Sequence, residues 1–195
     1  MKTRDRILEG ALALFNEEGA TTLTALDVAT ALGMSPGHLY YHFKGKAEIA
    51  ATLFDAFEGE LALVLEGALG ELAQPEAGVA ELFTHVQIVL EEVHDVRFLF
   101  REAGALALAF PALAPRYRRT FAALRGATAS MLAALAERGA IVADADSVEA
   151  LSRGMVLGLA FKLTQLDLEG AEEPPRKRIA RAAAEIMAPV LAVAT

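Results

Sequence analysis

The side chains best suited to chemistry lie between Thr24 and Lys46, where hydroxyl, imidazole and ammonium groups occur within one short segment. Such groups donate hydrogen bonds or carry a point charge, and proteins use them to contact nucleic-acid phosphates and base edges. The run Tyr40-Tyr41-His42 could instead be the aromatic part of a small helical core. The choice between these interpretations depends on the elements that position the segment.

The segment from Thr24 onward has the pattern of two short helices joined by a tight turn. Thr24 is a good N-cap, and Asp27 completes a capping-box pattern three residues later. Gly33 ends the first helix, because glycine tolerates a positive φ. Ser35 is the next N-cap, and Pro36 suits the first helical position because it lacks an amide hydrogen. Two short helices with a glycine-containing turn describe a helix-turn-helix, whose second helix enters the major groove of DNA.

At these residues the chain resembles the TetR family of one-component bacterial transcription regulators. The run Leu39-Tyr40-Tyr41-His42-Phe43 followed by Lys46 is the specific part of the resemblance, whereas a bare helix-turn-helix pattern would be weak. The other matching pieces are the Thr24 cap, Val28-Ala29 and Leu32-Gly33-Met34-Ser35.

The resemblance implies two sets of DNA contacts. Phosphate contacts are expected from Thr24, Tyr40, His42 and Lys46, and base edges are expected to face Pro36, Gly37, His38 and Tyr41 behind the Ser35 cap. Among the base-facing positions only His38 and Tyr41 carry donors, although Gly37 lets the backbone approach closely. Leu26 departs from the family pattern, which often has a polar or basic base-contacting residue there. Leu26 could contact a thymine methyl group or pack internally.

Charge is distributed unevenly along the chain. The 195 residues carry a formal net charge of −8. Residues 1–47 hold five basic and five acidic side chains, so the negative charge lies in the remainder. An acidic body favours solubility and disfavours non-specific adhesion to nucleic acid, while the few basic residues predict few phosphate contacts.

Composition also argues against several other kinds of protein. The chain has no cysteine, which removes disulfides, thiolate chemistry and Cys-ligated zinc. No apolar run approaches the ~18 residues needed to span a bilayer. The N-terminal residues lack the apolar stretch of a signal peptide. We therefore expect a cytoplasmic protein without a membrane segment or a bound cofactor.

Apolar residues recur at helical spacing throughout the chain, and no strand pattern interrupts them. We predict an all-α fold of about nine helices, with an N-terminal three-helix helix-turn-helix domain (residues 1–46) and a larger effector-binding and dimerisation domain (residues 47–195). Asp146 is the expected N-cap of the penultimate helix. The predicted helices span about residues 4–18, 25–32, 36–43, 46–72, 79–94, 95–108, 117–138, 146–168 and 175–193.

The penultimate predicted helix indicates a subunit interface. Between Met155 and Leu163 it is apolar nearly all round, apart from Lys162. Such a helix must be covered on two sides, one by its own core and the other by a second subunit. TetR relatives form homodimers through two helices of each chain, which strengthens this interpretation. The predicted interface residues are Gly154, Gly158, Ile179, Ala183, Ile186 and Val190.

The larger domain is rich in Phe and Leu, which favours a mainly apolar cavity for a hydrophobic or amphipathic small-molecule effector. His85 lies among apolar residues, and it is either a hydrogen-bonded core histidine or a polar group of that cavity. Taken singly, each aromatic candidate is more typical of a core residue than of a cavity lining. The candidate ligand-binding residues are His85, Phe100, Tyr117, Phe121 and Phe161.

These patterns predict a dimeric regulator, most readily a repressor that an effector releases from a palindromic double-stranded DNA operator. One alternative is a constitutive helical DNA-binding protein without an effector. Another is a helical di-metal enzyme, because Glu91 and His94 have the i, i+3 spacing of ferritin-like sites. Such a site needs a second Glu-x-x-His, and His38, His42 and His85 lack a glutamate three residues earlier. We therefore predict neither a metal site nor an enzyme.

Overall fold

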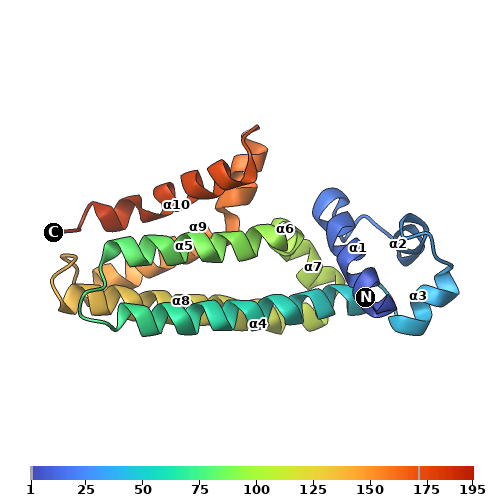
Figure 1. Cartoon of the computed structure of the whole chain (residues 1–195), viewed down its shortest axis with the longest axis horizontal. Helices are drawn as coiled ribbons and strands as arrows, with labels where there is room; N and C mark the ends of the chain where they lie inside the picture. The colour runs from blue at the N-terminus through green and yellow to red at the C-terminus, as the bar shows by residue number, and fades with distance from the viewer. Residues whose placement is uncertain (1, 171) are drawn as a thin grey trace. The chain divides into compact units, whose positions relative to one another are not determined.

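The computed structural model describes residues 2–170 and 172–195, which form ten α-helices and one short 3-10 helix (Figure 1). The predicted all-α fold is confirmed: the described residues contain one isolated β-bridge, between Ile141 and Ala194, and no strand. None of the described helices is long and apolar enough to cross a membrane. The elements are α1 (Thr3–Glu18), α2 (Ala25–Ala31), α3 (Pro36–His42), α4 (Lys46–Leu72), α5 (Val79–Asp95), α6 (Arg97–Arg101), α7 (Ala103–Ala109), the 3-10 helix (Pro111–Leu113), α8 (Ala114–Glu137), α9 (Ala145–Leu168) and α10 (Pro175–Leu191).

Two local features differ from the predicted helices. The single helix expected over residues 95–108 is divided at Glu102, which ends α6 and precedes α7, so there are ten α-helices rather than about nine. The expected cap at Asp146 is wrong, because α9 begins at Ala145 and the Asp144 carboxylate accepts a hydrogen bond from the Ser147 amide at 2.8 Å. Both aspartates precede a polar residue by three positions, so local sequence offered two possible starts.

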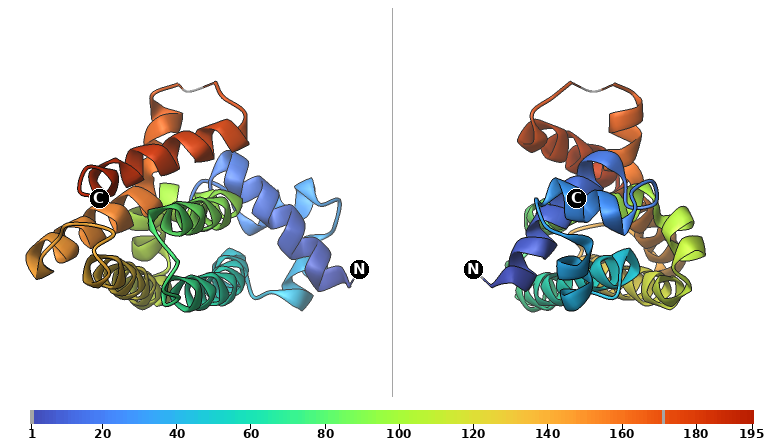
Figure 2. Two further views of the ribbon diagram at one scale, coloured as in Figure 1. Left: turned by 60° about the vertical axis from the view of Figure 1, so that its left-hand side comes forward. Right: turned by 90° about the vertical axis from the view of Figure 1, so that its right-hand side faces the viewer.

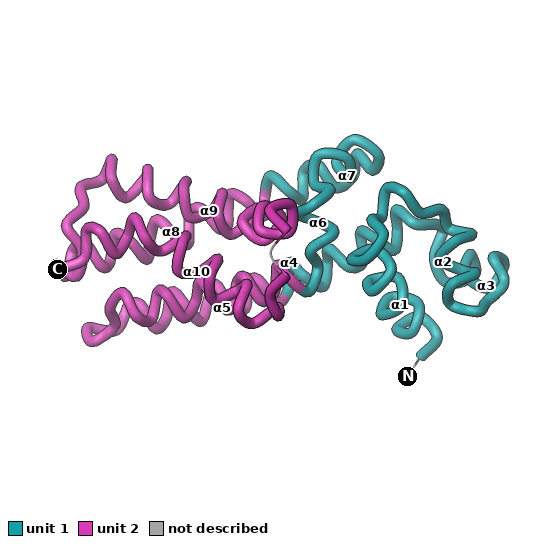
Figure 3. Tube along the Cα trace, turned by 90° about the horizontal axis from the view of Figure 1, so that it is seen from above, with its two compact units in different colours: residues 1–59, 95–118 teal, residues 60–94, 119–195 magenta. Residues whose placement is uncertain are grey.

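The chain divides into two compact units (Figure 3). The first contains the residues up to Gly59 together with Asp95–Arg118, and the second contains Glu60–His94 and Arg119–Thr195. The predicted domain boundary after residue 46 followed the end of the helix-turn-helix pattern. The first unit holds that pattern and also takes in the first part of α4, with α6 and α7.

The core of the first unit joins α1 to α6. Phe15 and Phe98 are fully buried, and their ring centroids lie 5.3 Å apart. The buried Asn16 side chain donates to the Asp95 carbonyl at 2.7 Å and accepts from the Phe98 amide at 3.1 Å. Because backbone groups at a buried helix junction need partners, this asparagine fixes the start of α6 against the end of α1.

In the second unit α10 packs along α9, as the views in Figures 1 and 2 show. The close approach occurs at Gly158, where an added Cβ would lie 2.6 Å from the Ile186 side chain of the same chain. The end of the chain is tied down beside the α8–α9 connection, since the Val142 amide donates to the Val193 carbonyl at 2.7 Å. The two helices therefore form a packed pair within one chain.

Candidate nucleic-acid interface and effector cavities

The two helices of the helix-turn-helix are capped as their sequence predicts. The Thr24 hydroxyl accepts from the Asp27 amide at 3.1 Å, and the Asp27 carboxylate accepts from the Thr24 amide at 2.8 Å. The Thr24 hydroxyl also donates to the Asp27 carboxylate at 2.7 Å, and this bond, followed by the one from the Thr24 amide, holds the pKa of Asp27 below its ordinary value. Gly33 adopts a φ of 64° at the turn. The Ser35 hydroxyl accepts from the His38 amide at 3.2 Å, with Pro36 in the first turn of α3.

One face of α3 is open to solvent and the other is anchored. Leu39 is fully buried, whereas Tyr41 is 84% exposed and His38 is also exposed. The His38 and Tyr41 rings both lie near the His42 ring, with centroids 5.5 Å and 5.0 Å from it. Donor groups of α3 thus gather on the face that is free to meet a partner. The predicted residues Thr24, Ser35, Pro36, Gly37 and Tyr40 are exposed as well, and His42 is partly exposed.

Leu26 is 56% exposed, so of the two possibilities for this residue the structure excludes internal packing. Its side chain stands on α2, whose buried residues are Val28 and Ala29. An exposed leucine on this helix provides an apolar contact and no hydrogen bond.

Lys46 has a structural role that the sequence did not suggest. Its ammonium group donates to the carbonyls of Thr21, at 3.2 Å, and Leu23. Burial lowers the pKa of Lys46, while the carboxylates of Glu102 and Asp27 oppose that shift. Two of its three hydrogens are therefore directed to the α1–α2 connection, and the ammonium group also lies 5.7 Å from the centroid of the Phe110 ring.

Two further side chains that sequence reasoning missed hold this connection and α3. The Glu102 carboxylate accepts from the amides of Ala20, at 3.1 Å, and Thr21, at 2.9 Å, and from the Thr21 hydroxyl. Arg4 donates to the His42 carbonyl at 3.0 Å and lies over the Phe43 ring, 4.2 Å from its centroid. A cation at the carbonyl end of α3 pairs with a carbonyl that has no partner within the helix, and it interacts favourably with the negative end of the helix dipole.

The five candidate ligand-binding residues are divided between the two units. Phe100 and Tyr117 are buried in the first unit, where Tyr117 donates to the Leu99 carbonyl at 2.6 Å and burial raises the pKa of its hydroxyl. Phe121 and Phe161 lie in the second unit with ring centroids 6.3 Å apart. His85 lines a separate, narrow cavity among α4, α5, α8 and α9.

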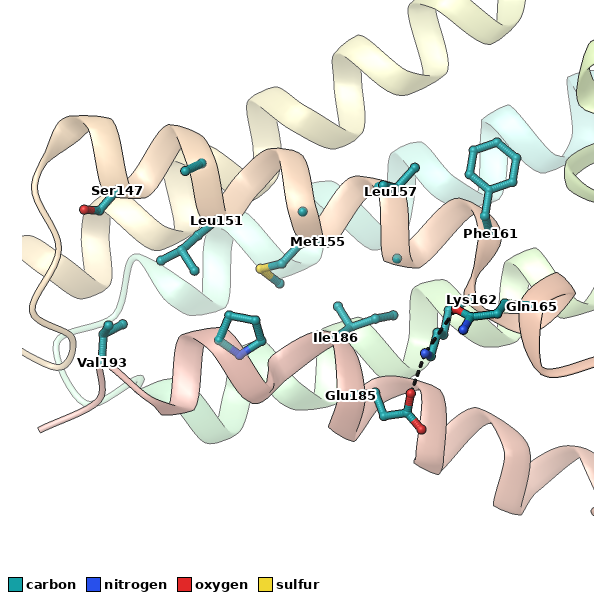
Figure 4. A pocket seen from close by; sticks show the side chains of 14 residues that line it. Ser147, Leu151, Met155, Leu157, Phe161, Lys162, Gln165, Glu185, Ile186 and Val193 are labelled. Atoms are coloured by element: carbon teal, nitrogen blue, oxygen red, sulfur yellow. Dashed lines mark hydrogen bonds and ion pairs between the residues drawn. The ribbon is translucent and has the colours of Figure 1, made fainter. Parts of the chain in front are cut away.

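A larger groove of about 830 Å³ runs between α9 and α10 (Figure 4). Its floor is mainly apolar, and Lys162 and Glu185 form an ion pair at one end. Among the predicted interface residues, Gly154 and Gly158 line the groove, and Ile186 does so while remaining buried. The other three, Ile179, Ala183 and Val190, are buried by contacts within the chain. The large exposed apolar side chains of the groove are instead Leu157 and Phe161.

The described residues contain no group of three or more His, Cys, Asp or Glu side chains placed to hold a metal ion. An anchored helix-turn-helix with an exposed donor face, followed by a helical body, defines a DNA-binding transcription regulator. A model of the bacterial regulatory proteins of the tetR family matches residues 7–53. A second model, of a bacterial transcriptional repressor, matches residues 57–195. The chain belongs to the TetR family of bacterial transcriptional regulators.

Individual relatives agree with this assignment. The chain is 30% identical over 86 residues to the HTH-type transcriptional regulator AcrR of Shigella flexneri, covering 44% of this chain and 40% of that protein. It spans about half or less of the length of the first curated relatives it matches. A TetR-family regulator structure from Marinobacter aquaeolei VT8 has a TM-score of 0.84 and 26% identity over 100% of this chain and 92% of that chain. The SmeT–triclosan complex shares the fold, with a TM-score of 0.62 and 19% identity over 99% and 92%.

Replacing Glu102 tests its role in holding the α1–α2 connection. We expect Glu102→Gln to lower the free energy of unfolding by about 1–3 kcal/mol, because a charged acceptor that pairs buried amides is lost. Hydrogen exchange at the amides of Ala20 and Thr21 should become faster. Glu17→Gln, at an exposed position of α1, is the matched control and should change neither the free energy of unfolding nor the exchange rates. Unchanged exchange at both amides in Glu102→Gln would show that the carboxylate does not hold them.

Proposed function

We propose that the chain acts in the cytoplasm as a repressor that binds a palindromic operator as a homodimer and is released by a hydrophobic or amphipathic small molecule. The observation that carries this proposal is the exposed donor face of α3, with His38 and Tyr41 in the open and Leu39 anchored in the core. That arrangement supports insertion of α3 into the major groove, because the helix offers donors on its outer face without losing its packing.

The proposed contacts follow from donor type and exposure. His38 and Tyr41, with the backbone near Gly37, are assigned to base edges. The remaining hydrogen of the Lys46 ammonium group is assigned to a phosphate. The other proposed phosphate contacts are Thr24, Tyr40 and His42, and Ser35 is the cap that precedes the base-facing residues.

Selection of bound sequences from a random DNA pool tests this assignment. We expect two inverted half-sites separated by one helical turn or a multiple, roughly 34–36 Å per turn. His38→Ala should change the preferred bases. Tyr40→Phe and Lys46→Ala should weaken binding to all DNA sequences alike. Lys46→Ala should also reduce the slope of the salt dependence of DNA binding by about one unit. If His38→Ala selects the same sequence, His38 does not contact bases.

The α9–α10 groove supports the homodimer. Leu157 is 64% exposed on α9, and Phe161 stands one turn further along the same helix. Exposed apolar side chains gathered around a groove are typical of a protein–protein interface. A second copy of the same pair of helices would cover this face symmetrically, since a two-fold interface uses one patch on both subunits.

The dimer is tested with two leucines of equal exposure. We expect Leu157→Asp to give monomers by sedimentation and to weaken operator binding, because the charge would be buried between subunits. Leu63→Asp on α4 is the matched control, since Leu63 is also 64% exposed and lies outside the groove. The Leu63→Asp chain should remain dimeric. A Leu157→Asp chain that also remains dimeric would place the interface elsewhere.

Effector release is supported by the apolar cavities of the second unit and by the solved relative SmeT, which was captured with triclosan. An effector can shift the equilibrium between the DNA-binding and the released conformation only by the difference in its affinity for the two conformations. The alternative is a constitutive DNA-binding protein, in which a ligand binds without changing DNA affinity.

Reciprocal titrations distinguish these two functions. A compound found by thermal-shift screening should bind the operator complex more weakly than the free protein, by about 5–150-fold. The operator should in turn bind the loaded protein more weakly by the same factor, because coupling free energy is shared by both ligands. Calorimetry with and without operator gives the first factor, and fluorescence anisotropy of labelled operator gives the second. Equal affinities would favour the constitutive protein.

A further inference from the structure

His85 on α5 is a buried polar group that the core does not fully satisfy. The residue is 8% exposed, and its Nε2 lies 2.7 Å from a carboxylate oxygen of Glu71 on α4. The other ring nitrogen, Nδ1, is buried and has no hydrogen-bond partner among the described residues. A buried polar atom without a partner is uncommon in folded proteins and calls for a partner that the described residues do not supply.

The pairing with Glu71 determines which ring nitrogen carries the hydrogen. An ionised carboxylate only accepts hydrogen bonds, so Nε2 is the donor of this pair. In the neutral imidazole the remaining nitrogen, Nδ1, is then an acceptor with a free lone pair. When the imidazole is neutral, the hydrogen bond to Glu71 therefore leaves Nδ1 of His85 as a hydrogen-bond acceptor facing the core.

This imidazole lines a cavity that is otherwise almost entirely apolar. Thr128 is the other side chain of the lining with a polar group, and no lysine or arginine is among the residues around it. The cavity measures about 10 Å³, room for about one water-sized probe. Met131 and Met155 form part of the wall, and their flexible thioether chains can rearrange to admit a larger molecule. The lining residues are Leu65, Ala68, Leu82, His85, Val86, Val89, Thr128, Met131, Met155 and Leu159.

We propose that this cavity opens to bind the effector, and that the effector is an apolar molecule with one hydroxyl group that donates to Nδ1 of His85. The inference rests on the proposed effector function and names the chemical class of the ligand. A hydroxyl supplies the missing donor at little desolvation cost. A carboxylate would be buried without a cation, and an ammonium group would bring an unpaired charge into an apolar site. An ether has the same apolar body but no hydrogen to donate.

Matched naphthalene probes test the ligand class by calorimetry on the full chain. We expect 1-naphthol to bind about ten-fold more tightly than 1-methoxynaphthalene, the factor that one net hydrogen bond provides. 1-Naphthoate and 1-naphthylmethylamine should bind more weakly than the naphthol. A naphthol that binds no better than the ether, a tighter naphthoate or amine, or no binding by any probe would overturn the proposal.

Two variants test the site itself. His85→Leu should abolish the preference for naphthol over the ether. Glu71→Gln is the milder change, because Glu71 is about half exposed and its amide can donate to Nε2, which frees Nδ1 to carry the hydrogen. The naphthol preference should shrink in this variant while the ether still binds. Glu66→Gln, on the exposed face of α4, is the matched control and should keep the full preference.

Two further measurements separate this inference from the proposed function. The ¹⁵N chemical shifts of the His85 ring should show hydrogen on Nε2 in the free protein and hydrogen on Nδ1 in part of the Glu71→Gln population. A naphthol preference that survives both His85→Leu and Glu71→Gln would place the ligand elsewhere and overturn the proposal. Operator binding by the same preparations, measured by anisotropy, reports on the regulator function independently. A hydroxyl preference without operator binding would support the ligand class while refuting repression.

Discussion

The DNA-binding part of the molecule depends on how the connection between α1 and α2 is satisfied. Ala20 is fully buried there, and its amide lies outside any helix. A buried amide must be paired, and the partner comes from Glu102, a residue far along the chain. The same carboxylate binds Thr21, while Lys46 binds the carbonyls of that connection. Opposite charges thus hold the amide and carbonyl sides of the single short segment that leads into α2.

The contacts that hold α3 explain why this helix can expose so much of its surface. A seven-residue helix has little stability of its own, and α3 gains it from one buried leucine and from contacts at its two ends. Ser35 caps the amide end and Arg4 binds the carbonyl end. Because packing and capping use only the inner face and the ends, His38 and Tyr41 are left for a partner.

The second unit combines a packed pair of helices with two kinds of apolar space. Gly158 lets Ile186 approach α9 closely within the chain, so the contact between these two residues already stabilises the single subunit. Leu157 lines the groove beside them and is exposed to solvent, and an exposed leucine at this place supports the proposed subunit contact. The cavity at His85 is of a different kind, since it is narrow, is lined by residues of four helices and has a buried ring nitrogen without a partner among the described residues. The proposed subunit contact and the proposed ligand site therefore lie at different places in one unit.

The sequence alone determined the features that depend on neighbouring residues. The caps at Thr24 and Ser35, the turn at Gly33 and the all-α class follow from local hydrogen bonding, backbone conformation and periodicity, which act within a few residues. Only the tertiary structure decided which side chains meet across long separations. The pairing of Glu102 with Thr21 and the pairing of His85 with Glu71 follow from how helices pack. An apolar stripe shows that a helix is buried and does not show against which partner, because hydrophobic burial is non-directional and many pairings satisfy it.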